Sequence, residues 1–457
     1  MLALAPGGAS GHDLWLLGCA AAGIAGIVVL VTVAEIHPFI ALIAGSAWVG
    51  LSAGAPAEDV VATFQRGVGE TLGGVGVVVA LGTMLGKLVA ESGAADRIVS
   101  VVVARAGARG LPWAMALVAM LVGMPMFFEV GLVLLMPVIA VMSRRTGASI
   151  LRVGIPALAA LSVCHGLVPP HPGPLIAAAA LHADVGHTIL VGLIVAVPTV
   201  ALAGPLFGAW CARRMDPRPP ATLVDELSRR EQDGEPPPFG VALATILLPV
   251  ALMVARSGVE VAGARGRPPW SVVAALGHPV SAMALSVVVA MWTLARSRGT
   301  TPRALRDMLA GSLAPIAGML MIIGAGGGFK QTLVDSGVGA AMAHAAQRSN
   351  APGLVLGWLI AAVIRVATGS ATVATVTASG IMAPLAAGLP PAGAPLLALS
   401  IGSGSLFFSH VNDAGFWLVK ECFGMSVGET VRSWSTMETI ISVVALACVL
   451  LLAAAGG

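Results

Sequence analysis

The chain has 457 residues, of which 57% are hydrophobic and only 10% are Asp, Glu, Lys or Arg, and its formal net charge is +3. A soluble domain carries roughly 25% charged residues, so this chain has too few of them to cover a soluble surface. The composition excludes an ordinary cytoplasmic enzyme, a disordered chain and a nucleic-acid-binding protein. It predicts an all-α polytopic membrane protein embedded in a lipid bilayer.

A helix that crosses a membrane requires about 20 apolar residues. The first such stretch has no basic segment before it, so we expect a retained span and not a cleaved signal peptide. Two stretches, 111–143 and 352–388, are too long for one span and are interrupted at 123–131 and 365–375. Each is either two spans, which gives fourteen hydropathy peaks in total, or a re-entrant hairpin. The ten single-span candidates are 14–34, 38–54, 72–90, 151–164, 187–211, 241–255, 279–295, 313–329, 395–408 and 434–452.

A polar, Pro-rich segment of mixed charge divides the chain in the middle. We interpret this segment, residues 212–240, as a cytoplasmic linker between a first repeat, 1–211, and a second repeat, 241–457. Residues 82–95 align with 326–339 at an offset of 244, and the same offset superposes the later interruptions of the two halves. An internal duplication of this kind is typical of transporters.

The two repeats are predicted to lie in opposite orientations in the membrane. Arg144, Arg145 and Arg152 flank the end of the first hairpin, whereas the equivalent loop 387–396 carries no charge. Because Lys and Arg concentrate in cytoplasmic loops, these two loops belong on opposite sides. An odd number of crossings in each half requires the same inversion. The predicted fold therefore has two inverted-topology repeats, each with five spans and a re-entrant hairpin, or ten spans and two hairpins.

Four interruptions are expected to meet at mid-membrane: the hairpin tips at 123–131 and 367–375, and the helix breaks at 164–174 and 409–416. Helices that begin at such breaks carry free N–H groups and partial positive charge, which suit an anion. The Ser, Thr, His and Asn side chains in these segments suit a hydroxylated substrate. The four segments contain only two carboxylates, so we expect neither a metal site nor a cofactor.

Glu129 is the leading candidate for a proton carrier, because a carboxylate buried in a membrane is costly and usually functional. The alternative is a structural Glu paired with a basic group or a backbone N–H. Asp413 is either a second such group or the cap of the half-helix that follows it. His165, His171 and His410 lie in the two breaks, where histidines carry protons or simply pack.

Arg365 precedes the tip of the second hairpin, where it is a counter-charge either for a carboxylate substrate or for an acidic side chain. The predicted substrate-facing residues are Ser370, Thr372, His410, Asn412, His165 and Arg365. The predicted proton-coupling residues are Glu129, Asp413 and His171.

Five blocks of the sequence resemble the gluconate permease family of bacterial proton symporters: 123–140, 161–174, 324–339, 365–381 and 402–443. The resemblance implies import of gluconate or a related sugar acid with protons across the bacterial plasma membrane. This family is similar to a larger ion-transporter superfamily with inverted repeats, re-entrant hairpins, homodimers and an elevator-like movement. Sodium-coupled members of that superfamily carry Ser-Asn-Thr hairpin tips, whereas the first tip here is Phe-Phe-Glu-Val-Gly, which favours protons.

Three alternatives remain open from the sequence. A protein of the same family can carry another small hydroxy or amino acid, such as D-serine. An uncoupled channel or facilitator with the same spans predicts no accumulation of substrate above equilibrium. A membrane-embedded enzyme requires a nucleophile and a base, or a metal site, and the sequence has no such motif.

Overall fold

The computed structural model describes residues 11–217, 236–264, 268–295, 299–338, 341, 353–386, 388–390, 392–410 and 413–456. These residues form helices joined by turns and short connections, with no strand among them. The prediction of an all-α architecture is therefore confirmed for the described part of the chain. Most of the predicted linker, residues 218–235, lies outside it.

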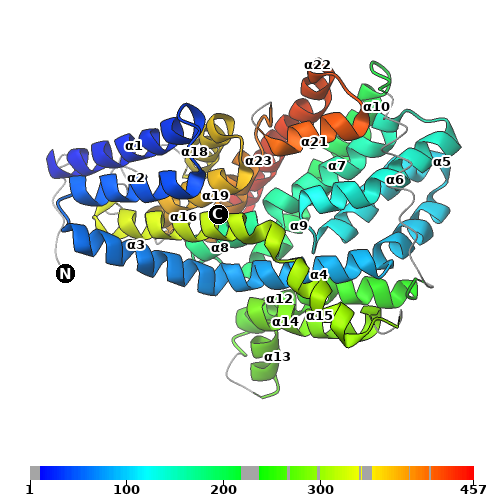
Figure 1. The fold of residues 1–457 in the computed structure, drawn as a ribbon, viewed down its shortest axis with the longest axis horizontal. Coiled ribbons are helices and arrows are strands. Elements are labelled where there is room, and N and C mark those ends of the chain that lie inside the picture. Colours follow the sequence, from blue (N-terminus) through cyan, green and yellow to red (C-terminus); the bar gives the residue numbers. More distant parts are fainter. Residues whose placement is uncertain are drawn as a thin grey trace.

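The first half begins with three helices that run side by side at one end of the molecule (Figure 1). Its later helices form the opposite end, around a long apolar core. The helices of this half are α1 (Gly11–Thr32), α2 (Pro38–Ser52), α3 (Ala57–Thr71), the π-helical η1 (Leu72–Gly76), α4 (Val77–Glu91), α5 (Ala94–Gly123), α6 (Phe128–Thr146), α7 (Ile150–Leu167), α8 (Pro172–Ala180), α9 (Val185–Ala201), η2 (Leu202–Leu206) and α10 (Phe207–Cys211).

The second half follows a comparable order: helices at the outside, then a helical hairpin, then a broken helix and a long final helix. Its helices are α12 (Phe239–Val261), α13 (Trp270–Leu276), α14 (Pro279–Ala290), η3 (Met291–Ala295), α15 (Pro302–Gly311), η5 (Ala314–Ile316), α16 (Ala317–Asp335), α18 (Gly353–Thr368), α19 (Ala371–Ala386), α20 (Gly393–Gly404), α21 (Ala414–Phe423), α22 (Val427–Thr430), η6 (Val431–Ser435) and α23 (Thr436–Gly456).

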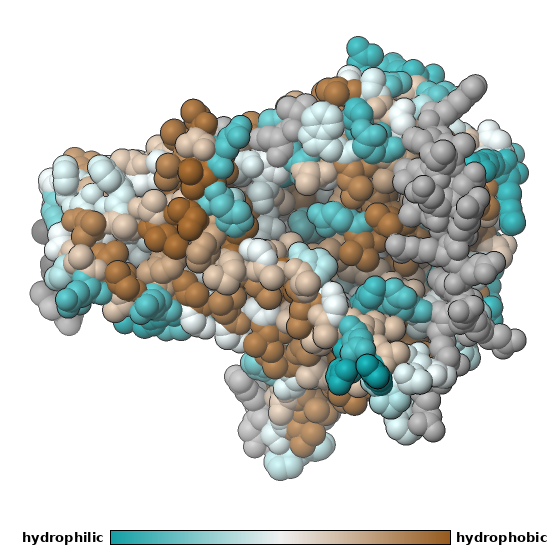
Figure 2. All heavy atoms as spheres, viewed as in Figure 1, coloured by the Kyte–Doolittle hydropathy of each residue, from teal (hydrophilic) through white to brown (hydrophobic). Residues whose placement is uncertain are grey.

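Seven helices among the described residues are long and apolar enough to cross a membrane, or eight when α13 and α14–η3, bent by 77°, count as one span. Several shorter apolar helices, α18, α19 and α20 among them, have the length of hairpin arms or half-spans. Large apolar side chains such as Val33, Trp48 and Ile194 are exposed, and Figure 2 shows apolar residues over much of one face. A lipid environment explains this surface, since water would disfavour it. The exact count of ten spans stays a prediction.

The four predicted interruptions coincide with or overlap breaks in the helices. Helix α5 is kinked at Gly107. The part of α5 after this kink forms the first hairpin together with α6, and the tip of the hairpin is 124–127. The second hairpin is α18 and α19, which turn at Gly369 and Ser370. The first broken helix is α7–α8, where Pro169 and Pro170 prevent continuation because proline lacks a backbone N–H. The second is α20–α21, separated by residues 405–413.

The two halves of the chain pack closely against each other where α3 crosses α16. A Cβ placed on Gly67 would lie 2.3 Å from the Gly327 carbonyl oxygen, and one placed on Gly327 would lie 2.6 Å from the Gly67 carbonyl oxygen. Only hydrogen at these two positions allows the backbones to approach so closely. The helices α3–η1–α4 and α15–η5–α16 therefore form two long arms, one from each half, that brace the molecule along its length.

We expect Gly67→Ala to lower the stability of the purified protein by about 1–3 kcal/mol, because the added methyl group overlaps a backbone atom that cannot turn aside. The drop is measured as a lower Tm in detergent. Gly69→Ala is the matched control on the same helix, since its Cβ meets no atom within 4 Å, and it should keep or raise the Tm. Equal Tm values for Gly67→Ala and the wild type would contradict this account of the crossing.

Candidate functional site

The four helix breaks lie against one another, and side chains from one break bond to the backbone of another. His171, before α8, uses Nε2 to donate a hydrogen bond of 2.7 Å to the Gly123 carbonyl at the end of α5. His410 donates in the same way to the Val366 carbonyl at the end of α18, over 3.1 Å. Each broken helix is thus tied to the hairpin of its own half by a histidine.

Contacts between the halves complete this arrangement. The ring of Phe128, at the start of α6, lies 5.1 Å from the ring of Trp434, just before α23. The Trp434 indole N–H in turn donates to the Ser409 hydroxyl over 2.7 Å. The first hairpin is therefore linked through Trp434 to the break of the second half. This contact agrees with the prediction that the interruptions meet, and their place at mid-membrane stays a prediction.

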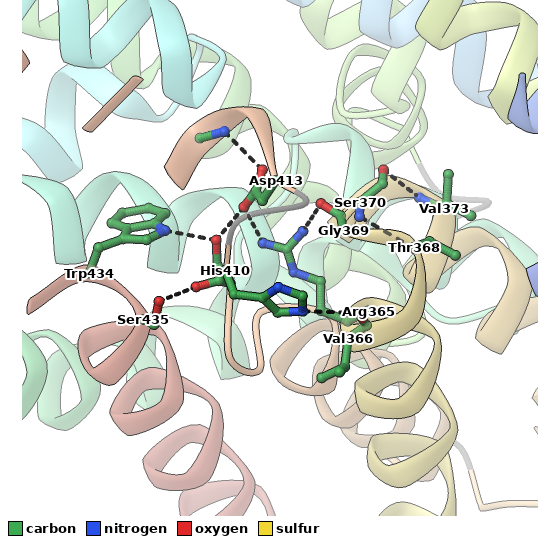
Figure 3. A network of polar contacts seen from close by, with 12 residues as sticks. Arg365, Val366, Thr368, Gly369, Ser370, Val373, His410, Asp413, Trp434 and Ser435 are labelled. Atoms are coloured by element: carbon green, nitrogen blue, oxygen red, sulfur yellow. Dashed lines mark hydrogen bonds and ion pairs between the residues drawn. The ribbon is translucent and has the colours of Figure 1, made fainter. Parts of the chain in front are cut away.

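Arg365 occupies the centre of this region and is only 4% exposed. Its guanidinium donates to the Gly369 carbonyl at the tip of the second hairpin and to the Asp413 carboxylate (Figure 3). Its third nitrogen, Nε, is buried and has no hydrogen-bond partner among the described residues. The acidic side chain that the sequence left open as a partner for Arg365 is thus Asp413, which lies 48 positions later.

Asp413 also caps α21, because one of its oxygens accepts the Gly415 N–H at 2.8 Å. Its other oxygen accepts from both Arg365 and the Ser409 hydroxyl. Ser435 donates to the Ser409 carbonyl, which fixes this segment from the side of α23. The interpretation of Asp413 as a helix cap is therefore confirmed, and its role in proton coupling stays a prediction.

Histidines in the first break lie close to these charges. The His165 ring centroid is 5.7 Å from that of His171, and His165 interacts electrostatically with Glu129, Arg365 and Asp413. Its Nδ1 is buried without a hydrogen-bond partner among the described residues. The structure thus brings His165 close to Arg365 and Asp413, which together we call the charged cluster. His171 instead is hydrogen-bonded to the end of α5.

The remaining predicted residues are placed as follows. Ser370 and Thr372 are half-buried at the tip of the second hairpin, and the Ser370 hydroxyl accepts the Val373 N–H at 3.2 Å. His410 is half-buried beside Phe408. Asn412 lies outside the described residues.

The exposure of the Glu129 side chain was not expected from the sequence. The sequence placed this carboxylate in an apolar hairpin and predicted burial, but in the single chain its side chain is exposed, in the first turn of α6 at the hairpin tip. Glu129 and Val130 lie on the uncovered side of this turn, whereas Phe128 and Gly131 on its other side are buried within the protein. Burial of Glu129 in the membrane stays a prediction. Its role in proton coupling stays a prediction.

The sequence interpretation missed Glu438. This residue is 1% exposed in the first turn of α23. A signal was present, because Glu438 is the only charged residue in the predicted span 434–452. The argument applied to Glu129, that an ionisable group in an apolar span is usually functional, would have found it.

A cavity of about 200 Å³ opens between the arms and the hairpin region. Glu70 of α3 and Lys330 of α16 line it on one side, and Ile176 of α8 and Val376 of α19 on the other. The described residues contain no group of three or more His, Cys, Asp or Glu arranged to hold a metal ion.

A family model described as GntP family permease matches residues 15–455. The chain is 51% identical to a gluconate permease of Pseudomonas aeruginosa, over 96% of this chain and 98% of that protein. It is 43% identical to a high-affinity gluconate transporter of Escherichia coli, over 94% of this chain and 98% of that protein. It is 39% identical to an L-idonate transporter of Escherichia coli, over 94% and 97% of the two chains.

Two solved structures share the fold at low sequence identity. The YdaH transporter of Alcanivorax borkumensis matches with a TM-score of 0.67 and 16% identity, over 92% of this chain and 98% of that one. MtrF of Neisseria gonorrhoeae, described with a class of antimetabolite efflux pumps, matches with a TM-score of 0.61 and 15% identity, over 90% and 93%. At these identities the likeness concerns the arrangement of helices alone.

Proposed function

The chain belongs to the GntP permease family, and from this membership we propose that it imports gluconate or a closely related sugar acid together with protons. The protein is a transporter and not an enzyme, and it crosses the bacterial plasma membrane several times. The observation that carries the substrate proposal is the 51% identity, over nearly the full length, to a protein named gluconate permease.

The substrate site in this proposal lies where the four helix breaks meet. Arg365 attracts the carboxylate of a sugar acid, with its unpartnered Nε as a free donor. The hydroxyl groups of Ser370 and Thr372 and the rings of His165 and His410 then match the hydroxyl groups of the substrate. Asn412 belongs to this proposed set from its position in the sequence.

Helix ends add to the attraction for an anion. The helices α6, α8, α19 and α21 all begin at the breaks, and no side chain caps the N-terminus of α6 or α8. Their free N–H groups carry partial positive charge, which favours an anion at close range. This supports a carboxylate substrate over a cation.

We extend the proposal to the architecture: the two halves are inverted repeats. A repeated order of arm, hairpin, broken helix and final helix supports this. The C-terminal ends of the broken helices α7 and α20 also lie together, since a Cβ on Gly402 would be 2.1 Å from the Gly166 carbonyl oxygen. Half-helices that meet end to end at mid-depth are expected from inversion about an axis in the membrane plane. The homodimer remains a prediction.

The test is uptake of labelled gluconate into proteoliposomes with the interior one pH unit more alkaline than the exterior. With one proton per gluconate we expect up to about tenfold accumulation, since a tenfold proton gradient supplies that free energy. A panel with L-idonate and D-serine as competitors identifies the preferred substrate.

Two controls separate coupled transport from its alternatives. Protein-free liposomes measure leakage, and an uncoupler should abolish accumulation in the protein-containing vesicles. Equilibration to equal concentrations, with no sensitivity to the uncoupler, would instead identify an uncoupled facilitator.

A further inference from the structure

Glu438 is a carboxylate inside the protein that the proposed function does not yet use. It lies in the first turn of α23 and is 1% exposed. Ser162 of α7 lies near it, whereas its Oε1 is buried and has no hydrogen-bond partner among the described residues. An ionised carboxylate with an unpartnered, buried oxygen is costly, and a proton removes most of that cost.

The helices packed against α23 bring few charges to Glu438. It interacts electrostatically with Arg365 of α18 and with Asp413 before α21. The histidine nearest along α7 is His165, one turn after Ser162. Neither α20 nor η2 contains a charged residue, and the one titratable residue of α9 is His187, in its first turn.

Helix α23, which carries Glu438, is hydrogen-bonded to the second hairpin. The Trp358 indole N–H of α18 donates to the Ser442 hydroxyl of α23 over 2.9 Å, one turn beyond Glu438. At the other side, Trp434 and Ser435 bond to Ser409 in the second break. Glu438 therefore has a fixed position relative to both Arg365 and the break that contains Asp413.

The protonation state of Glu438 sets the charge of this cluster. Arg365 and Asp413 neutralise each other, so with His165 neutral the cluster carries one negative charge when Glu438 is ionised and none when it is protonated. A substrate anion that approaches Arg365 is repelled in the first state and not in the second. By linkage, the anion must in turn strengthen proton binding at Glu438.

From this geometry we infer that Glu438 is the proton-binding residue whose occupancy is coupled to binding of the substrate anion beside Arg365. The inference rests on the proposed proton-coupled transport and assigns its coupling site. One proton enters Glu438 as one carboxylate binds, so the loaded cluster keeps the charge of the empty, deprotonated one. Glu129, which is exposed at the hairpin tip, is not required in this role.

The experiment compares purified wild type with Glu438→Gln and Glu129→Gln in proteoliposomes. Glu421→Gln is the matched control, because that glutamate side chain is 68% exposed on α21. Two transport modes are measured: accumulation of labelled gluconate driven by one pH unit, and counterflow at equal pH, which requires no net proton movement. The Kd of gluconate is measured from pH 6 to pH 8.

We expect Glu438→Gln, which resembles the protonated state, to keep counterflow within about threefold of wild type while accumulation falls to equilibrium. Its Kd for gluconate should no longer vary with pH, whereas the wild-type Kd should rise with pH. Glu421→Gln should behave as wild type in all three measurements. Accumulation by Glu438→Gln at the wild-type level would overturn the inference, and so would loss of accumulation in Glu129→Gln alone.

Two further results distinguish failure of the Glu438 assignment from failure of the proposed proton symport. If wild type itself does not accumulate gluconate, proton symport is wrong, and the inference falls with it whatever the variants do. If Glu438→Gln does not reach the membrane folded, Ser162→Ala replaces it. Loss of the polar hydroxyl near the carboxylate makes the ionised form less favourable, so the midpoint of the pH dependence of the gluconate Kd should move to higher pH. An unchanged midpoint would overturn the inference.

Discussion

Arg365→Met is expected to abolish gluconate transport and to lower the Tm of the purified protein. Arg365 is 4% exposed and the side chain of Asp413 is 16% exposed. Removal of the guanidinium leaves the Asp413 carboxylate without its counter-ion, at a cost of about 3–5 kcal/mol for buried pairs. It also removes the hydrogen bond to the Gly369 carbonyl at the hairpin tip. We expect transport to fall by at least about 100-fold, a difference of about 2.8 kcal/mol.

The partner variant separates stability from function. Asp413→Asn combined with Arg365→Met removes both charges, so we expect the double variant to recover much of the lost Tm but no transport. Arg432→Met, at an exposed position before α23, is the control for loss of an arginine and should retain both properties. Wild-type Tm and transport in Arg365→Met would refute the assignment of a central role to this pair.

Gly402→Ala is expected to have the second largest effect on transport and Tm. Its added methyl group should force α7 and α20 apart close to the breaks that end both helices. Its added Cβ would lie 2.1 Å from the Gly166 carbonyl oxygen. A backbone atom in a buried helix cannot move aside, so the helices themselves must shift, at a cost of about 1–3 kcal/mol or more. The shift displaces the breaks that position Arg365 and Asp413, so counterflow as well as Tm should fall sharply.

A graded series tests this explanation. At Gly166 the nearest atom to an added Cβ is in the Leu406 side chain, at 2.5 Å, and a side chain can turn away. Gly166→Ala should therefore have a smaller effect than Gly402→Ala. Gly258→Ala on α12 meets no atom within 4 Å and should be neutral. Equal Tm values for all three variants would show that the crossing is not tightly packed.

Much of the fold was predictable because hydrophobic length and proline placement are local properties. The break after α7 follows directly from Pro169 and Pro170, and the second hairpin from the glycine and serine at its tip. Arg365 was identified because a lone arginine in an apolar stretch is conspicuous. Its partner was not, since Asp413 lies 48 positions later and only folding brings the two side chains together.

The carboxylates show where the sequence argument failed. Glu129 and Glu438 both lie in the first turn of an apolar helix, so composition alone gives them the same interpretation. Their exposures differ because α23 packs against α20, α9, α7 and α18 and Glu438 lies inside this packing, whereas Glu129 is uncovered at the start of α6. Burial of a single side chain depends on tertiary packing, which a hydropathy pattern does not encode.

The interlocked arms have a consequence for how the polypeptide is made. The arm of the first half packs against α14 and α16 of the second, and the main apolar core draws residues from both halves. The parts of the chain before and after the predicted linker therefore share one packed core. Two separately translated fragments, cut within residues 218–235, would each expose unpaired glycine faces such as that of Gly67 until they associate in the same bilayer. Neither fragment should persist without the other in a cell that degrades unassembled membrane proteins.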